Sequence, residues 1–212
     1  MDSAAIDHLV IAAADLETGR DWLNRHLGVE PQPGGQHLTM GTHNVLLGLG
    51  PGCYLEVIAI DPGLPAPDRP RWFGLDRPDV RRRLRQGPCL LHWVARVDED
   101  TIGQKGIEER FGRPTPMARG EWRWQLTIPD DGSLPLHGAG PSLIHWHSRH
   151  PTDVLPESGC RLKRLTVTST DVDDLRSALS PWDWPDVLTF AQGNRVGLRA
   201  EIQTPKGVIS LS

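Results

Sequence analysis

The chain has 212 residues with 38% hydrophobic side chains, which is enough for a substantial core, and a formal net charge of -4. This mild acidity excludes the broad basic surface that nucleic-acid binding requires. No run of about 18 apolar residues indicates a membrane segment. The three cysteines at 53, 89 and 160 lack both Cys-x-x-Cys spacing and an even number. We therefore expect a soluble cytoplasmic protein that binds neither nucleic acid nor membrane.

The first unit is predicted to run from residue 1 to 62 as a strand, a helix and three strands. A strand at 6–11 precedes Asp15, a good helix N-cap, and apolar side chains at helical spacing continue to Leu27 before Gly28 stops the helix. Strand patterns follow at 36–40, 44–49 and 54–60. The predicted order is βαβββ.

Segment 63–87 is predicted to be a connector, because proline is frequent in and around it and disfavours regular structure. A short helix is expected at 78–85. The second unit, 88–148, begins with a strand at 89–97 and continues with a weak helix at 101–111 that contains Gly103 and Gly106. Strands at 121–128 and 142–147 follow, with one further strand placed around 134–137, so the order is again βαβββ.

A third unit is predicted at 161–212, after a linker at 149–160. It has a strand at 162–168, a short helix that begins after Thr170, and strands at 187–190, 197–203 and 208–211. One supersecondary unit is therefore used three times, which predicts an α+β fold built from repeated modules.

His8 and Glu56 lie on the first and last strands of the first unit. Side chains alternate along a strand, so His8 shares a face with Ile6 and Val10, and Glu56 shares one with Tyr54 and Ile58. A polar group on an apolar face needs a partner. A shared metal ion satisfies both residues, although a hydrogen-bonded core histidine and a solvated glutamate are the alternatives.

The repeated βαβββ unit, with histidine on its first strand and a carboxylate on its last, resembles the vicinal-oxygen-chelate superfamily of glyoxalases, extradiol dioxygenases and bleomycin-resistance proteins, and its glyoxalase-like branch in particular. The matching segments are IDHLVI at 6–11, GGQH at 34–37, GTHN at 41–44, YLEVI at 54–58, WFGL at 72–75, WRW at 122–124 and PDDG at 129–132. The resemblance implies that two units pair into an open cup that holds a divalent metal.

The resemblance also implies a ligand set, with one residue from the first and one from the last strand of each module. The corresponding positions are His8, Glu56, His92 and His145. The spacings agree, since 48 positions separate the first pair and 53 the second. His145 stands where glutamate is usual, so it is alternatively a catalytic group, and His147 is its possible substitute. The set suits Zn, Fe, Ni or Mn, and ligand type alone does not choose among them.

A metal in an open cup binds substrates through neighbouring oxygens and acts as a Lewis acid. Glu56, His37 and His43 are the candidate catalytic bases, although histidines beside glycine turns often only cap the backbone. Candidate substrate-binding residues are Trp122, Trp124, Arg96 and Asn44. For the tryptophans the alternative is a core position, and for Arg96 a salt bridge at the rim.

Three functions fit these residues. The leading one is a divalent-metal-dependent lyase or isomerase that acts on a small oxygenated substrate. The alternatives are ring cleavage by an extradiol-type dioxygenase with Fe²⁺ on His8, His92 and Glu56, and metal-free sequestration of a small molecule.

The third unit carries Arg164 in the position of His8, and arginine is not a metal ligand. This unit is therefore expected to be architectural. It either caps the cup sheet within the chain or pairs with a second chain, and a homodimer is the favoured form.

Overall fold

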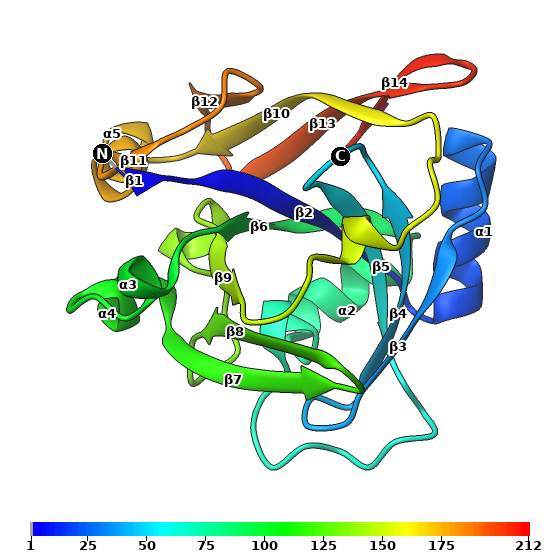
Figure 1. The fold of residues 1–212 in the computed structure, drawn as a ribbon, viewed down its shortest axis with the longest axis horizontal. Coiled ribbons are helices and arrows are strands. Elements are labelled where there is room, and N and C mark those ends of the chain that lie inside the picture. Colours follow the sequence, from blue (N-terminus) through cyan, green and yellow to red (C-terminus); the bar gives the residue numbers. More distant parts are fainter. Residues whose placement is uncertain (1) are drawn as a thin grey trace.

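The computed structural model describes residues 2–212 and contains an eight-stranded sheet, a four-stranded sheet and a two-stranded pair (Figure 1). The eight-stranded sheet curls into an open half-barrel, and only a few short helices accompany it (Figure 1). The predicted α+β class is therefore confirmed. None of the helices in the described residues is long and apolar enough to cross a membrane.

The first module has the predicted element order. Its elements are β2 (Ala5–Ala12), α1 (Leu16–Leu27), β3 (Gln32–His37), β4 (Thr42–Gly48) and β5 (Tyr54–Ile60). Helix α1 begins where expected, because the Asp15 carboxylate accepts a hydrogen bond from the Thr18 amide at 2.8 Å. It ends at Gly28, whose φ of 71° is the left-handed conformation that glycine adopts easily.

The connector contains the short helix η1 (Trp72–Gly74) and the predicted helix α2 (Pro78–Leu84). The second module consists of β6 (Cys89–Arg96), α3 (Glu99–Ile102), α4 (Ile107–Phe111), β7 (Arg113–Arg119), β8 (Trp122–Ile128) and β9 (Ser142–Trp146). The expected helix at 101–111 is split in two, because Gly103 and Gly106 interrupt it. The prediction of a strand around 134–137 is wrong, because the short helix η2 (Leu136–Gly138) occupies that place. The fourth strand of the module is instead β7, which precedes β8.

The two modules meet at β2 and β6, which pair antiparallel. The strand order of the large sheet is β3-β4-β5-β2-β6-β9-β8-β7. Outward from the centre, each half therefore contains the first, the last, the third and the second strand of its module. In each module the first strand pairs parallel with the last one, β2 with β5 and β6 with β9. This arrangement brings the first and last strands of both modules together in the middle of the sheet.

The third unit has the predicted element types but a different strand order. It comprises β10 (Arg161–Ser169), α5 (Val172–Leu179), β12 (Leu188–Gln192), β13 (Gly197–Thr204) and β14 (Gly207–Leu211), while β11 (Trp182–Asp183) pairs with β1 (Asp2–Ser3). Strand β10 lies between β12 and β13, whereas the first strand of each other module pairs with its last. The third unit is thus a separate four-stranded sheet and does not extend the half-barrel.

Two apolar clusters cover the two faces of the large sheet. On the outer face, Leu9 and Trp93 belong to one cluster with Leu165 and Ile202 of the third unit. On the inner face, Val10 and Val94 pack with Trp72 and Phe73 of the connector. The third unit therefore covers the sheet within the same chain, and the homodimer stays a prediction.

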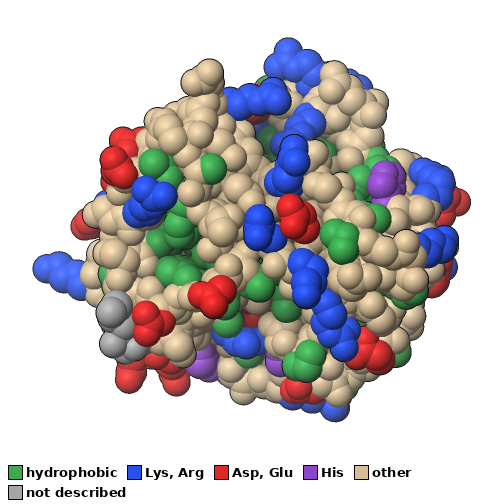
Figure 2. Space-filling view, turned by 90° about the horizontal axis from the view of Figure 1, so that it is seen from above, with side chains coloured by type: hydrophobic (Ala, Val, Ile, Leu, Met, Phe, Trp, Pro, Cys, Tyr) green, Lys and Arg blue, Asp and Glu red, His purple; other side chains and the backbone are tan. Residues whose placement is uncertain are grey.

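The far side of the four-stranded sheet faces solvent. Leu165 and Val167 of β10 are buried, whereas Arg164 and Arg199 on its other side are exposed. Figure 2 shows Lys and Arg side chains distributed over the surface seen from above, among neutral side chains and backbone. The alternation of buried apolar and exposed charged side chains along these strands is typical of an antiparallel sheet with one face in the core.

Gly19 allows α1 to pack closely against β5. A Cβ atom at this position would lie 2.5 Å from Val57 Cγ1 and 2.7 Å from Ala13 Cβ. Gly19→Ala is therefore expected to lower the free energy of unfolding by about 1–3 kcal/mol, despite the better helix propensity of alanine. Urea denaturation measures this effect. Gly103→Ala is the control, because its Cβ meets only ordinary contacts at 3.5 Å or more; equal stability changes in the two variants would contradict the packing explanation.

Candidate functional site

The two central strands are each interrupted by one extra residue at the middle of the sheet. Ile6 pairs with Ala95 and His8 with Val94, so Asp7 has no partner in the ladder. Val10 pairs with His92 and Ile11 with Leu90, so the extra residue in β6 is Leu91. Such bulges turn side chains out of simple alternation. Asp7 therefore contacts its neighbour His8, and the second module has leucine in the equivalent place.

Asp7 is completely buried and accepts hydrogen bonds from four side chains, of which that of Arg96 is the longest at 3.5 Å. Its Oδ1 accepts from His8 Nδ1 at 2.7 Å, and its Oδ2 accepts from Trp146 Nε1 at 3.1 Å and from His150 Nε2 at 3.0 Å. Burial by itself raises the pKa of Asp7, but the bonds from His150 and His8 outweigh it and hold the pKa below its usual range. Asp7 is thus an anion that fixes the ring of His8.

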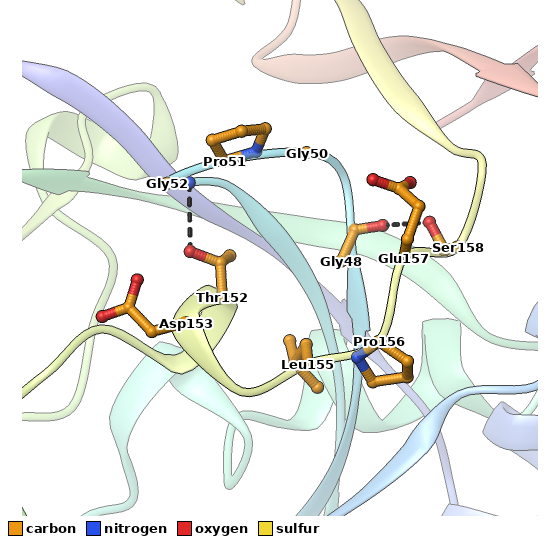
Figure 3. Close-up of a pocket in the computed structure, with 10 residues that line it drawn as sticks. All are labelled: Gly48, Gly50, Pro51, Gly52, Thr152, Asp153, Leu155, Pro156, Glu157 and Ser158. Carbon is orange, nitrogen blue, oxygen red and sulfur yellow. Dashed lines mark hydrogen bonds between the residues drawn. The ribbon is translucent and has the colours of Figure 1, made fainter.

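His150 reaches Asp7 from the linker between the second and third units. The linker contains the short helix η3 (Pro151–Asp153) and lies beside the turn that joins β4 to β5 (Figure 3). Gly52 donates its N–H to Thr152 Oγ1 at 3.0 Å, and Ser158 donates to the Gly48 carbonyl. These contacts hold the linker against the first module and so place His150.

His8 and Glu56 lie side by side, as their strand positions predicted. Their Nε2 and Oε2 atoms are 3.6 Å apart, and both side chains are buried. Because Asp7 binds Nδ1 of His8, the Nε2 atom is the one that faces Glu56. The other oxygen of Glu56, Oε1, accepts a hydrogen bond from Asn44 Nδ2 at 2.6 Å. Arg119 in turn donates to Asn44 Oδ1 at 3.1 Å.

His37 is the second imidazole in this group. Its Nδ1 is 3.0 Å from Thr42 Oγ1, and its Nε2 is 3.5 Å from Asn44 Nδ2. Burial, aided by the positive charge of Arg119, lowers the pKa of His37 to about 3. The ring is therefore neutral at pH 7.

The side chains of His8, His37, Asn44, Glu56 and Arg119 line a small, partly open cavity of about 30 Å³. Apolar and aromatic side chains complete the wall, among them Tyr54, Leu46, Trp72, Phe73, Trp124, Leu126, Ile144 and Trp146. Trp72 and Phe73 come from the connector and cover the inner face of the sheet. The connector thus forms one wall of the cavity.

His92 is buried beside this group but bonds within its own module. Its Nε2 accepts a hydrogen bond from the Ser142 backbone N–H at 3.0 Å and lies 3.0 Å from Ser142 Oγ. Its Nδ1 has no partner among the described residues. Burial, together with the charge of His8, lowers the pKa of His92 to about 3.

The structure separates His145 from the other three predicted ligands, which corrects the expected four-residue set. Glu56 lies opposite Val10 in the β2–β5 ladder, and Ser142 lies opposite Val94 in the β6–β9 ladder. The partner of Glu56 in the second module is therefore Ser142. Three residues later, His145 points to the other face, where its Nδ1 lies 3.1 Å from the Val97 carbonyl. Counting positions along the chain misplaced the ligand because it ignored the strand register.

Three other predicted site residues, His43, Arg96 and Trp122, do not line the cavity. His43 follows the strand alternation opposite to Asn44, and its Nδ1 is 3.5 Å from Asp61. Arg96 binds Asp7 at 3.5 Å and the carbonyl of Gly52 at 3.3 Å. Trp124 and Asn44 do line the cavity. Trp122 instead packs under Arg149, whose Cζ atom is 5.3 Å from the centre of the indole ring.

Sequence reasoning missed Asp7, Arg119 and His150. Simple alternation assigns Asp7 to the face opposite His8, and only the bulge brings them together. Arg119 is in β7, a strand that was not predicted, and His150 is in a linker without a strand or helix pattern. For Asp7 the sequence contained one signal, which was a carboxylate directly before the strand histidine His8.

One solved structure with a similar fold supports the architecture described above. A protein from Staphylococcus aureus described as hypothetical has a solved structure that aligns over 91% of this chain and 88% of its own, with a TM-score of 0.58 and 15% identity. Methylmalonyl-CoA epimerase from Mycobacterium tuberculosis covers 66% of this chain and 85% of its own, with a TM-score of 0.42 and 19% identity. No curated protein matches the sequence.

The family model of the glyoxalase-like domain matches residues 6–182. This range includes both modules of the half-barrel, the connector and the beginning of the third unit. It covers most of the chain, and it confirms the resemblance to the vicinal-oxygen-chelate superfamily. The chain therefore belongs to the glyoxalase-like domain family.

Proposed function

We propose that the protein is a divalent-metal-dependent isomerase or lyase that acts on a small oxygenated substrate in the cavity of the half-barrel. The observation that supports this proposal best is the pair of His8 Nε2 and Glu56 Oε2, which are 3.6 Å apart on two buried side chains that line the same cavity. The enzyme class rests on this pair and on its surroundings. The fold alone does not define the enzyme class, because one fold supports many reactions.

The residues of the first module fit a metal ion. Ligand atoms bound about 2.1 Å from one ion lie roughly 3 to 3.5 Å apart, close to the spacing of His8 Nε2 and Glu56 Oε2. The Asp7 carboxylate on Nδ1 gives His8 the orientation that metal-binding histidines commonly have. His92 would join them only if its ring turned, because its Nε2 accepts the Ser142 N–H and the neutral ring then carries its proton on Nδ1. Imidazole and carboxylate suit Zn²⁺, Fe²⁺, Ni²⁺ or Mn²⁺.

A bound ion supplies Lewis acidity that polarises a carbonyl oxygen. Glu56 is the one carboxylate among the described residues that line the cavity, so the roles of metal ligand and proton acceptor both fall to it. Asn44 holds Glu56 Oε1, which leaves Oε2 as the oxygen that faces His8 Nε2 and would bind the ion. Arg119 lies beside Asn44 and offers a positive charge to an anionic substrate group. His37 is neutral and supplies a hydrogen-bond partner.

His8→Ala and Glu56→Gln are expected to abolish stoichiometric metal binding in this cavity and to lower turnover by about 100-fold or more. Both changes remove a proposed ligand. Metal content is measured on protein purified without chelator, and proton exchange next to a carbonyl is followed by NMR for a panel of small oxo acids and their thioesters. His43→Ala is the matched control, because this histidine lies outside the cavity.

Retention by both variants of activity and of as many bound metal ions as the wild type would contradict the proposed site. Wild-type protein without metal and without stabilisation by added metal would favour a binding protein, for which the aromatic walls of Trp72 and Trp124 would hold the ligand. Oxygen uptake with catechols would favour the dioxygenase.

A further inference from the structure

We infer that Glu99, His145 and His147 form a second metal site, for Zn²⁺, on the outer side of the large sheet. One nitrogen from each histidine and one carboxylate oxygen of Glu99 all lie within 4.8 Å of one another. Two imidazoles and one carboxylate are a ligand set that zinc accepts in proteins. The site uses none of the residues that line the His8 cavity.

Strand geometry brings the two histidines together. His145 is near the end of β9, and His147 follows two positions later, so alternation directs both side chains to the same side. Their ring centres are 4.7 Å apart. Helix α3 begins with Glu99 and packs beside β9, which supplies the third ligand from a different element.

The ring of His145 is already held by a hydrogen bond at one of its nitrogens. Its Nδ1 lies 3.1 Å from the carbonyl of Val97, so an N–H at this atom donates to that oxygen. Val97 is fixed in turn, because its N–H donates to the Ile144 carbonyl at 3.0 Å. A backbone carbonyl on one ring nitrogen leaves the other nitrogen with its lone pair for a metal. His145 is therefore oriented before any ion binds.

Among the described residues, none forms a hydrogen bond or salt bridge with the Glu99 carboxylate that would explain its position. Within residues 2–212, no hydrogen bond or salt bridge joins its carboxylate to either imidazole, although all three groups lie within 4.8 Å. This spacing is too long for direct pairing and requires only a small closure around an ion. Glu99 and His147 are exposed and His145 is half-buried. Solvent thus has access to a fourth coordination position.

The two proposed sites lie on opposite faces of β9. Ile144 belongs to the inner cluster and lines the cavity, whereas the next residue, His145, points outward. Glu99 comes from the helix that follows β6, so an ion here would join α3 to the end of β9. We expect Zn²⁺ to stabilise this corner of the second module.

Titration with Zn²⁺ by calorimetry, and with Co²⁺ by visible absorption, tests the inference on the full chain. We expect the absorption of a tetrahedral Co²⁺ site in the wild type. His147→Ala and Glu99→Gln are each expected to weaken binding at this site by more than about tenfold, because each removes a ligand. His26→Ala is the matched control, since His26 is an exposed histidine on α1 away from this group.

The His8→Ala variant separates this site from the cavity. Retention of one bound Zn²⁺ in His8→Ala, and its loss when His147→Ala is added, would support the inference even if the cavity binds no metal. Unchanged Zn²⁺ affinity in both His147→Ala and Glu99→Gln would overturn it. So would the loss of all binding in His8→Ala while its thermal unfolding and circular dichroism remain those of the wild type.

Discussion

Replacing Asp7 by alanine is expected to lower the free energy of unfolding by about 3–5 kcal/mol. The substitution leaves the buried donors of His8, Trp146 and His150 without their shared acceptor. It also frees the ring of His8, so metal affinity in the cavity is expected to fall by about 10- to 100-fold. Chemical denaturation and metal titration measure the two effects. Asp68→Ala is a control that removes an exposed carboxylate of the connector and spares this network.

Asp7→Asn tests the charge separately from the shape. Because the pKa of Asp7 in the folded protein lies below its ordinary value of 3.8, the stabilisation by its charge is complete above about pH 4 and is lost as the pH falls further. The difference in unfolding free energy between wild type and Asp7→Asn is therefore expected to narrow from pH 4 towards pH 2. A constant difference over this range would show that the charge of Asp7 does not stabilise the fold.

Ile202→Asp is expected to destabilise the protein by roughly 4 kcal/mol or more, because it places an unpaired carboxylate between the two sheets. Ile202 is completely buried and belongs to the cluster that includes Leu9 and Trp93. A loss of this size approaches the whole stability of an ordinary domain, about 5–15 kcal/mol. Thermal unfolding and soluble yield measure the effect.

Val208→Asp is the matched control, since Val208 is 60% exposed. It is expected to change stability by less than about 0.5 kcal/mol. Removal of residues 157–212 is expected to reduce solubility for the same reason as Ile202→Asp, because it uncovers the outer face of the large sheet. A truncated protein that stays folded and monodisperse would contradict this role of the third unit.

Local signals predicted most of the fold. The N-cap Asp15 and the stop at Gly28 placed α1 correctly, and strand alternation placed β2, β5 and β6. Strand β7 was missed because it contains Pro114 and Pro116. Proline is tolerated there because β7 is at the edge of the sheet, where a missing N–H breaks few ladder bonds. Edge position is a property of the assembled sheet, so the local pattern did not contain it.

The site was predictable only where side chains follow regular alternation. His8 and Glu56 obey it and lie together, whereas Asp7 depends on a bulge. The equivalence of Ser142 with Glu56 depends on register, which the ladders of two separate strand pairs define. The second module consequently offers Leu91 and Ser142 where the first has Asp7 and Glu56. The repeated unit is symmetric in backbone but not in chemistry.

The aromatic wall of the cavity has a consequence for how such proteins diversify. Trp72 and Phe73 come from a segment that belongs to neither module and contributes no strand to the large sheet. Gly74 fixes this segment to the second module, because its N–H donates to the Gly132 carbonyl at 2.7 Å. Insertions or substitutions between the modules can therefore reshape the entrance and change which molecules are admitted, while the duplicated framework and its polar groups are inherited intact.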